Sequence, residues 1–371
     1  MGANNPAEDL KKTPFYKYHV ASGAKMVPFA GYLMPVQYGG ITEEHQAVRE
    51  NVGLFDLSHM GEFFVRGSGA LAFIQKMTTN DASVLEVGQI QYTCMCHDNG
   101  GIVDDLLVYR LDDGYMLVVN AANIEKDFEW LNAHLDDNVE LVNKSDDYGL
   151  LAIQGPNAIK VITDMSGFDF DSIGYYHSAK ANFGGHEILF SRTGYTGEDG
   201  FELYIPNAMA DDLWKLTFDS GVKHDMKLIG LGARDSLRLE MKMTLYGNDI
   251  DQTTTPIEAG LAWIVKPDKG DFIGKDVLVR QKAEKPSRRL ICLELEGRAF
   301  PRHGYEITAN NETVGEVTSG TFSPSLGKPI ALGYLPRKLT KLGSKVEIKI
   351  RNKMFPATLV KPPFYREGSH R

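Results

Sequence analysis

The first 240 residues alternate between strand-like and helix-like hydrophobic patterns. Short, mostly apolar runs such as 102–109 and 150–153 are typical of buried strands. One segment between them carries apolar side chains at helical spacing: Ile124, Phe128, Leu131 and Leu135. Units of strand and helix recur in both halves of this region without a clean sequence repeat. The pattern predicts the α+β class, with lobes built on antiparallel sheets.

Two hairpins are predicted in these lobes. Strands at 89–96 and 102–110 flank an Asn-Gly turn, which supplies the positive-φ residues that a tight turn requires. Strands at 187–191 and 201–205 flank the loop Arg192–Gly200, which holds three glycines, two acids, a tyrosine and an arginine. Hairpin loops usually need about two to five residues. This longer loop therefore predicts a binding role, with a plain acidic hairpin as the alternative.

A helix is predicted from Thr42 to Val52. Thr42 is a candidate N-cap, and Glu43 and Glu44 suit the positive first turn. Gly53 is expected to end the helix in a left-handed conformation.

The pattern changes near residue 287, where short strands separated by Gly, Pro and Asn replace the strand–helix units. Six strands are predicted, at 289–296, 306–309, 313–318, 330–334, 345–350 and 355–360. They indicate a small barrel or sandwich. Three parts are therefore expected: residues 1–281 with two α+β lobes, a linker at 282–287, and a barrel domain at 288–371.

Composition describes an ordinary globular protein. The chain has 371 residues, of which 43% are hydrophobic and 24% charged, and this length suits two or three domains. The N-terminus has no export signal, no apolar run is long enough to span a membrane, and the three cysteines form no disulfide framework. A cytoplasmic protein without membrane partners is expected.

Charge is distributed unevenly. The net charge is −9, yet residues 281–371 hold 17 Lys and Arg against 8 Asp and Glu. The acidic remainder argues against nucleic-acid binding. The basic end suits an acidic partner, an anionic substrate tail or only a solvated surface. No dinucleotide, phosphate-loop or zinc-type motif occurs, so no NAD or metal site is indicated.

Asp104 and Asp105 interrupt an apolar strand. Neighbours on a strand point to opposite faces, so one of the two carboxylates faces the covered side. A buried carboxylate is costly unless it is paired or functional. One of the two is therefore a site candidate, with an ordinary salt bridge at a sheet edge as the alternative.

A helix predicted over 230–240 places Arg234 and Arg238 on one face, as part of a site or as an ion-paired surface turn. Several tyrosines accompany the acids: Tyr92, Tyr109, Tyr175, Tyr176 and Tyr195. Their rings and polar tips suit a flat heterocycle or ordinary strand packing.

Motifs along nearly the whole chain resemble the aminomethyltransferase family, the T-protein of the glycine cleavage system. They are Lys12–Phe15, Gly23–Gly31, Phe55–Glu62, Asn99–Asp105, Gln154–Pro156, Arg192–Glu202, Gly230–Asp235, Gly320–Leu326 and Lys361–Tyr365. Tyr32 departs from the pattern, because the family commonly has tryptophan there. The resemblance implies two interlocked lobes and a C-terminal β-barrel around a central folate channel.

The resemblance also implies a reaction. The family takes an aminomethyl group from the lipoyl arm of the H-protein, releases ammonia and passes the one-carbon unit to tetrahydrofolate, giving 5,10-methylenetetrahydrofolate. Tetrahydrofolate is a co-substrate, and no metal, flavin or NAD is implied. Carried over by position, Asp105 is the catalytic acid, Glu198 binds the pterin and Arg234 contacts folate. Weaker matches at channel-lining positions are Tyr92, Tyr109, Asn120, Tyr175, Met60 and Arg366.

Two related classes remain as alternatives. A non-transferase folate-binding protein of the same superfamily, of the kind that serves iron–sulfur assembly, places a cysteine in the glycine-rich loop, and residues 192–200 contain none. The folate domain of a sarcosine- or dimethylglycine-type demethylase needs an attached flavin domain, for which this chain has no motif.

Overall fold

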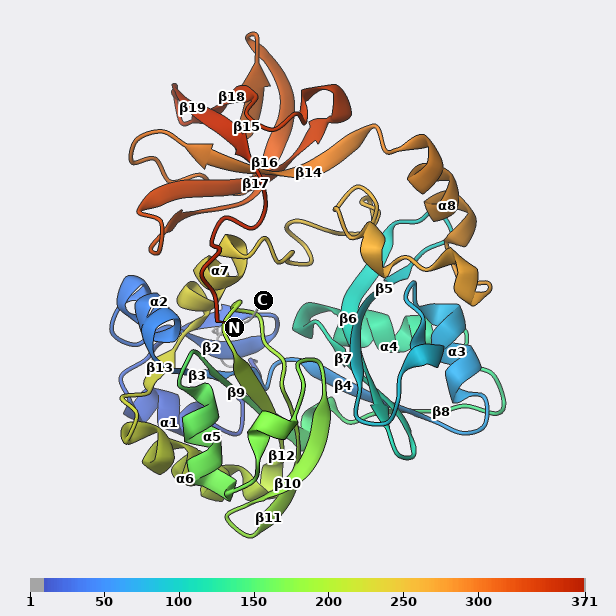
Figure 1. Cartoon of the computed structure of the whole chain (residues 1–371), viewed down its shortest axis with the longest axis vertical. Coiled ribbons are helices and arrows are strands. Elements are labelled where there is room, and N and C mark those ends of the chain that lie inside the picture. Colours follow the sequence, from blue (N-terminus) through green and yellow to red (C-terminus); the bar gives the residue numbers. More distant parts are fainter. Residues whose placement is uncertain (1–9, 370–371) are drawn as a thin grey trace, which may run out of the picture.

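The computed structural model describes residues 10–369. Residues 1–9, where the sequence predicts no export signal, and residues 370–371 lie outside this range. Two lobes of helices and sheets lie beside each other, with a barrel of strands above them (Figure 1). The predicted α+β class with a C-terminal barrel is confirmed.

The first lobe is built on a five-stranded antiparallel sheet in the order β5-β6-β7-β4-β8. Its strands are β4 (Gly61–Arg66), β5 (Ile90–Cys96), β6 (Ile102–Leu111), β7 (Gly114–Val119) and β8 (Glu140–Asn143). Two helices, α3 (Ala70–Met77) and α4 (Ile124–Asn132), pack over a core that includes Phe63, Phe73 and Leu131. The predicted hairpin of β5 and β6 is present.

The second lobe holds a six-stranded sheet in the order β10-β11-β12-β9-β3-β13, antiparallel except for the pair β3 and β13. Its strands are β3 (Gly53–Asp56), β9 (Tyr148–Gln154), β10 (Ser178–Phe183), β11 (His186–Ser191), β12 (Gly200–Pro206) and β13 (Lys227–Ile229). Its helices are α2 (Ile41–Glu50), α5 (Ala158–Ser166), α6 (Ala210–Val222) and α7 (Leu231–Glu240). The N-terminal part adds α1 (Tyr16–Ala21) and the hairpin of β1 (Lys25–Phe29) and β2 (Tyr32–Gln37).

The two lobes are interlocked along the chain. β3 pairs with β9 and β13 in the second sheet, whereas the next strand, β4, pairs with β7 and β8 in the first. A hydrophobic cluster with members from both sheets fills the interface and contains Phe55, Phe64, Tyr109, Met116 and Tyr204. The interlock places β6 and β12 on either side of one shared interface.

The C-terminal part is a closed barrel in the order β14-β17-β16-β15-β18-β19, in which β19 pairs back to β14. Its strands are β14 (Arg288–Leu295), β15 (Glu306–Ala309), β16 (Glu312–Ser323), β17 (Lys328–Pro336), β18 (Lys345–Ile350) and β19 (Lys353–Val360). Closure excludes the sandwich alternative. The helix α8 (Lys275–Glu284) leads into the barrel, and the domain division at 282–287 stays a prediction.

The predicted boundaries of α2 are wrong at both ends. The N-cap position belongs to Gly40, and Gly53 lies in β3 rather than in a left-handed turn. A Cβ atom on Gly53 would lie 2.4 Å from Cγ1 of Ile229 and 2.6 Å from Cγ2 of Val48. The glycine is therefore required by close packing between α2 and the sheet.

A buried polar network joins the barrel to the second lobe. Glu240, at the end of α7, accepts a hydrogen bond from Ser323 of β16 at 2.5 Å and pairs with Arg49 of α2 at 2.9 Å. Arg238 is fully buried and donates to Ser319 of β16 at 2.8 Å. Within residues 10–369, no helix is long and apolar enough to cross a bilayer.

Candidate active site

Both lobes contribute to one cavity of about 350 Å³. Its charged side chains are Asp105 from β6, Glu202 from β12, Arg234 from α7, and Lys242 just after α7. Much of the remaining wall is aromatic or aliphatic and includes Leu57, Met60, Tyr92, Tyr176, Tyr195, Leu245 and Trp263. A mainly apolar cavity with a few convergent charged groups is the usual form of a small-molecule site.

Asp105 is held at both carboxylate oxygens. The hydroxyl of Tyr92 donates to Oδ2 at 2.8 Å, and Nδ2 of Asn120 donates to Oδ1 at 2.9 Å. Burial, followed by the negative charge of Asp104, raises the pKa of Asp105 to about 7. A fixed carboxyl that titrates near neutrality suits proton transfer.

Asp104 occupies the opposite face of the same strand, as the alternation of strand side chains predicts. It is fully buried and accepts hydrogen bonds from Asn123 at 2.6 Å and from the backbone N–H of Asn120 at 3.0 Å. Of the two adjacent acids, Asp105 is the one that lines the cavity.

Glu202 reaches the cavity from β12. Phe201 and Leu203 point into the core of the second lobe, so the residue between them faces the other lobe. The carboxylate is buried and accepts a hydrogen bond from the hydroxyl of Thr193. Burial raises the pKa of Glu202, and the positive charge of Arg234 opposes that shift.

Arg234 and Arg238 have different environments although they share a helix. Arg238 forms ion pairs with Asp249 at 2.6 Å and Asp235 at 2.7 Å. The ion pairing of the surface-turn alternative is therefore present, but Arg238 is buried and does not lie at the surface. Within residues 10–369, no carboxylate lies within ion-pair distance of Arg234. Its guanidinium instead lies over the ring of Tyr195, 4.6 Å from the centroid. Glu202 acts on Arg234 electrostatically from beyond ion-pair distance. A buried cation without a direct ion pair is suited to an anionic ligand.

The cavity brings together five of the residues that the sequence resemblance selects: Met60, Tyr92, Asp105, Asn120 and Arg234. Four others lie elsewhere: Tyr109, Tyr175, Glu198 and Arg366.

Glu198 is directed away from the cavity. Gly197 precedes it with φ 82°, and the Glu198 carboxylate pairs with Arg49 at 2.8 Å and accepts from the Ser369 hydroxyl at 2.6 Å. It therefore links the glycine-rich loop to α2 and to the C-terminal segment. Glu202, four residues later, is the glutamate that lines the cavity.

The other three lie outside the cavity lining for separate reasons. Tyr109 is fully buried deeper in the interface, where its hydroxyl bonds to that of Tyr204 at 2.6 Å. Tyr176, rather than its neighbour Tyr175, lines the cavity. Arg366 is exposed and donates to the backbone carbonyl of Lys361 at 3.2 Å.

Sequence reasoning missed Glu202, Lys242 and Trp263. Glu202 had a usable signal, because a carboxylate within the buried strand β12 raises the same question as the acids of β6. Trp263 lies outside any strand or α-helix, and 60% of its surface is exposed at the edge of the cavity. No periodic pattern marks a residue of that kind.

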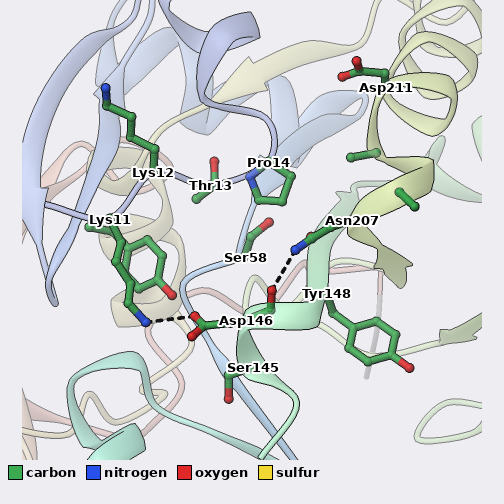
Figure 2. Close-up of a pocket in the computed structure, with 13 residues that line it drawn as sticks. Lys11, Lys12, Thr13, Pro14, Ser58, Ser145, Asp146, Tyr148, Asn207 and Asp211 are labelled. Atoms are coloured by element: carbon green, nitrogen blue, oxygen red, sulfur yellow. Dashed lines mark hydrogen bonds and ion pairs between the residues drawn. The ribbon is translucent and has the colours of Figure 1, made fainter.

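A second, larger hollow of about 610 Å³ lies near the N-terminal residues (Figure 2). Three of its four charged groups form ion pairs, among them Asp211 with Lys17 at 2.6 Å. Lys11 pairs with Asp146 at 2.8 Å, and the Asn207 amide donates to the Asp146 carbonyl at 2.8 Å. Because most of its charged groups are already ion-paired, the cavity of Asp105 is the better candidate for the active site.

Comparisons with known proteins give a consistent result. The family model for the GCVT N-terminal domain matches residues 15–269, and that for the glycine cleavage T-protein C-terminal barrel domain matches residues 288–366. The aminomethyltransferase of Chloroherpeton thalassium is 51% identical, and that of Halothermothrix orenii is 49% identical. These alignments cover 97% and 96% of this chain and all of each relative.

A solved structure agrees with the sequence matches. The glycine cleavage system aminomethyltransferase T of Bartonella henselae superposes with a TM-score of 0.91 at 35% identity, over 98% of this chain and 100% of that chain. Fold and cavity together define an enzyme of the T-protein type. The chain belongs to the aminomethyltransferase family of the glycine cleavage system.

Proposed function

We propose that this enzyme transfers the one-carbon unit of an aminomethyl group, carried on the lipoyl arm of an H-protein, to tetrahydrofolate. Ammonia is released and 5,10-methylenetetrahydrofolate is formed. The observation that carries the proposal is the convergence of Asp105, Glu202 and Arg234 on one cavity. Family membership supports the reaction class, and the folate, the carrier protein and a cytoplasmic location are our assignments.

The residues of the cavity fit a reduced pterin. A pterin presents adjacent N–H donors, and the buried Glu202 carboxylate is an acceptor for them. Hydrogen bonds to a charged group contribute roughly 1.5–3 kcal/mol each. The rings of Tyr176 and Tyr195 suit a flat heterocycle, and Arg234 suits the anionic part of folate.

Asp105 is the group that handles the proton in this proposal. When bound, tetrahydrofolate supplies the nitrogen nucleophile that takes the carbon. Positive charge develops beside that nitrogen, where the Asp105 carboxylate stabilises it and accepts its proton. Tyr92 and Asn120 fix the two oxygens of Asp105, so little reorganisation is needed during the reaction.

Substitution of Asp105 tests this role. Asp105→Asn should lower kcat for ammonia release from aminomethyl-loaded H-protein by about 10²–10⁴-fold, because the general base is lost. Folate should still bind, as measured by calorimetry. Asp113→Asn is the matched control, since Asp113 is an exposed carboxyl at the turn after the same strand. Full turnover by Asp105→Asn would refute the assignment.

The pH dependence gives an independent test. A base acts in its ionised form, and the pKa of Asp105 is raised to about 7. The value of kcat/KM should therefore be low in acid and should rise as the pH increases through about 7. A rate profile for ammonia release between about pH 5.5 and 8.5 measures this limb. A profile that is flat across that range would contradict the role of Asp105.

A further inference from the structure

Asp127, on α4, is a buried acid that the proposed reaction does not use. Its side chain has no solvent exposure, and neither carboxylate oxygen accepts a hydrogen bond from a donor in residues 10–369. The ammonium of Lys126 lies 3.6 Å from Oδ1, which is a long ion pair but not a hydrogen bond. An ionised carboxylate that is fully buried and accepts no hydrogen bond would still be destabilised, so the group needs either a proton or a closer partner.

The partner lies on β6. Asp127 and Asp104 interact directly, and burial together with the charge of Asp104 raises the pKa of Asp127. Asp104 is already an acceptor for Asn120 and Asn123. Since these amides donate to Asp104, the proton is favoured on Asp127 and the charge on Asp104.

Asn120 connects this pair to the cavity. Its Nδ2 donates to Oδ1 of Asp104 at 2.9 Å and to Oδ1 of Asp105 at 2.9 Å. The same amide therefore touches the buried acid on one face of the strand and the cavity acid on the other.

We propose that Asp127 is a positioning residue whose protonated carboxyl donates a hydrogen bond to Asp104. Asp104 then stays ionised and repels the Asp105 carboxylate. Asn120, which donates to both Asp104 and Asp105, holds the two carboxylates in place. The inference rests on the proposed function and deepens it, because it names the groups that keep the pKa of the general base, Asp105, near neutral pH. The charge of Asp104 raises the pKa of Asp105, after burial itself.

Other ionisable groups also interact with Asp105: Tyr92 and Cys94 on β5, and Tyr176, Tyr195 and Tyr246. Burial raises the pKa of each of them, so all are neutral at physiological pH. The other charged side chains of the cavity are Glu202, Arg234 and Lys242, and all three are retained in every variant considered below. Asp104 is therefore the charge whose removal should change Asp105.

The kinetic test compares Asp104→Asn, Asp127→Ala and Asp127→Asn. Asp104→Asn removes the repelling charge and should move the acidic limb of kcat/KM to lower pH by about one unit. Asp127→Ala removes the hydrogen-bond donor, so Asp104 takes up a proton and the acidic limb of the kcat/KM profile should also move to lower pH. Asp127→Asn keeps a donor, so its acidic limb should lie at the same pH as in the wild type. Asp113→Asn controls for the loss of a carboxylate.

A spectroscopic test on the full chain separates this inference from the proposed reaction. Infrared spectra at pH about 8 should contain a protonated carboxyl band that is missing in Asp127→Asn. If the wild-type band persists unchanged in that variant, Asp127 is ionised and the inference fails. An unmoved limb in Asp104→Asn would also overturn it. If wild-type protein releases no ammonia, the proposed function fails, whereas the infrared comparison still decides the state of Asp127.

Discussion

At the scale of single residues, the direction of a side chain decides which acids can act. Asp104 and Asp105 are adjacent, yet one lies under α4 and the other lines the cavity. Glu198 and Glu202 differ in the same way, because one follows a left-handed glycine and the other lies within a strand. Residue type and spacing do not distinguish the two acids of either pair. The backbone geometry decides which of the two faces the cavity.

This difference predicts that the same substitution affects ligand binding at Glu202 but stability at Glu198. Glu202→Gln should weaken tetrahydrofolate binding by about tenfold or more, because a charge-assisted hydrogen bond to the pterin is lost. Glu198→Gln should mainly lower the melting temperature, because it breaks the buried pair with Arg49. Calorimetric Kd values and thermal unfolding of both variants measure the two effects. If Glu198→Gln alone weakened binding, the residue carried over from the family resemblance would be the correct one.

At the scale of elements, much of the fold could be predicted from local patterns. The β5–β6 hairpin followed from Asn-Gly between alternating strands, and β15 and β18 match their predicted ranges residue for residue. Barrel closure followed from the family resemblance and not from local patterns, because it depends on β19 pairing with β14 and a sandwich has the same local pattern. Strand alternation limited the candidates to one acid of the pair Asp104 and Asp105, and the family resemblance selected Asp105, which lines the cavity. Neither marked Trp263, which lies in a single 3-10 turn.

Gly53 gives a prediction at this scale. Gly53→Ala should lower the free energy of unfolding by about 1–3 kcal/mol, because its Cβ would overlap Ile229 and Val48. Gly39→Ala is the control: Gly39 is not in a left-handed conformation, and the added carbon would meet only the flexible end of the Glu43 side chain, at 3.3 Å. Urea denaturation of both variants measures the difference. Equal stability of the two variants would show that α2 and β13 can move apart at no cost.

At the scale of the whole molecule, the barrel is joined to the second lobe by buried charges rather than by apolar packing alone. Glu240 contacts α2 and β16 at once, and its hydrogen bonds, together with nearby positive groups, lower its pKa to about 2 against the effect of burial. The outer surface of the barrel carries exposed lysines, which include Lys338, Lys341, Lys345 and Lys349. These lysines are candidates for receiving an acidic carrier protein.

Charge reversal tests that candidate surface. Replacing these four lysines by glutamate should raise the KM for H-protein and weaken its dependence on salt, because electrostatic attraction is removed. Charge reversal of Lys215 and Lys223, exposed lysines of the second lobe, is the control. Steady-state rates at low and high ionic strength give both quantities. Unchanged KM and salt dependence would exclude the barrel lysines from docking.

The position of β3 also has a consequence for synthesis in the cell. This strand ends at Asp56, but its parallel neighbour β13 begins only at Lys227. At about 5–20 residues per second, a ribosome needs roughly 10 to 30 s to deliver the missing neighbour. During that interval β3 has an unpaired edge, which is a target for chaperones and for aggregation. A gene split between these two points would leave the sheet of the second lobe incomplete in both halves.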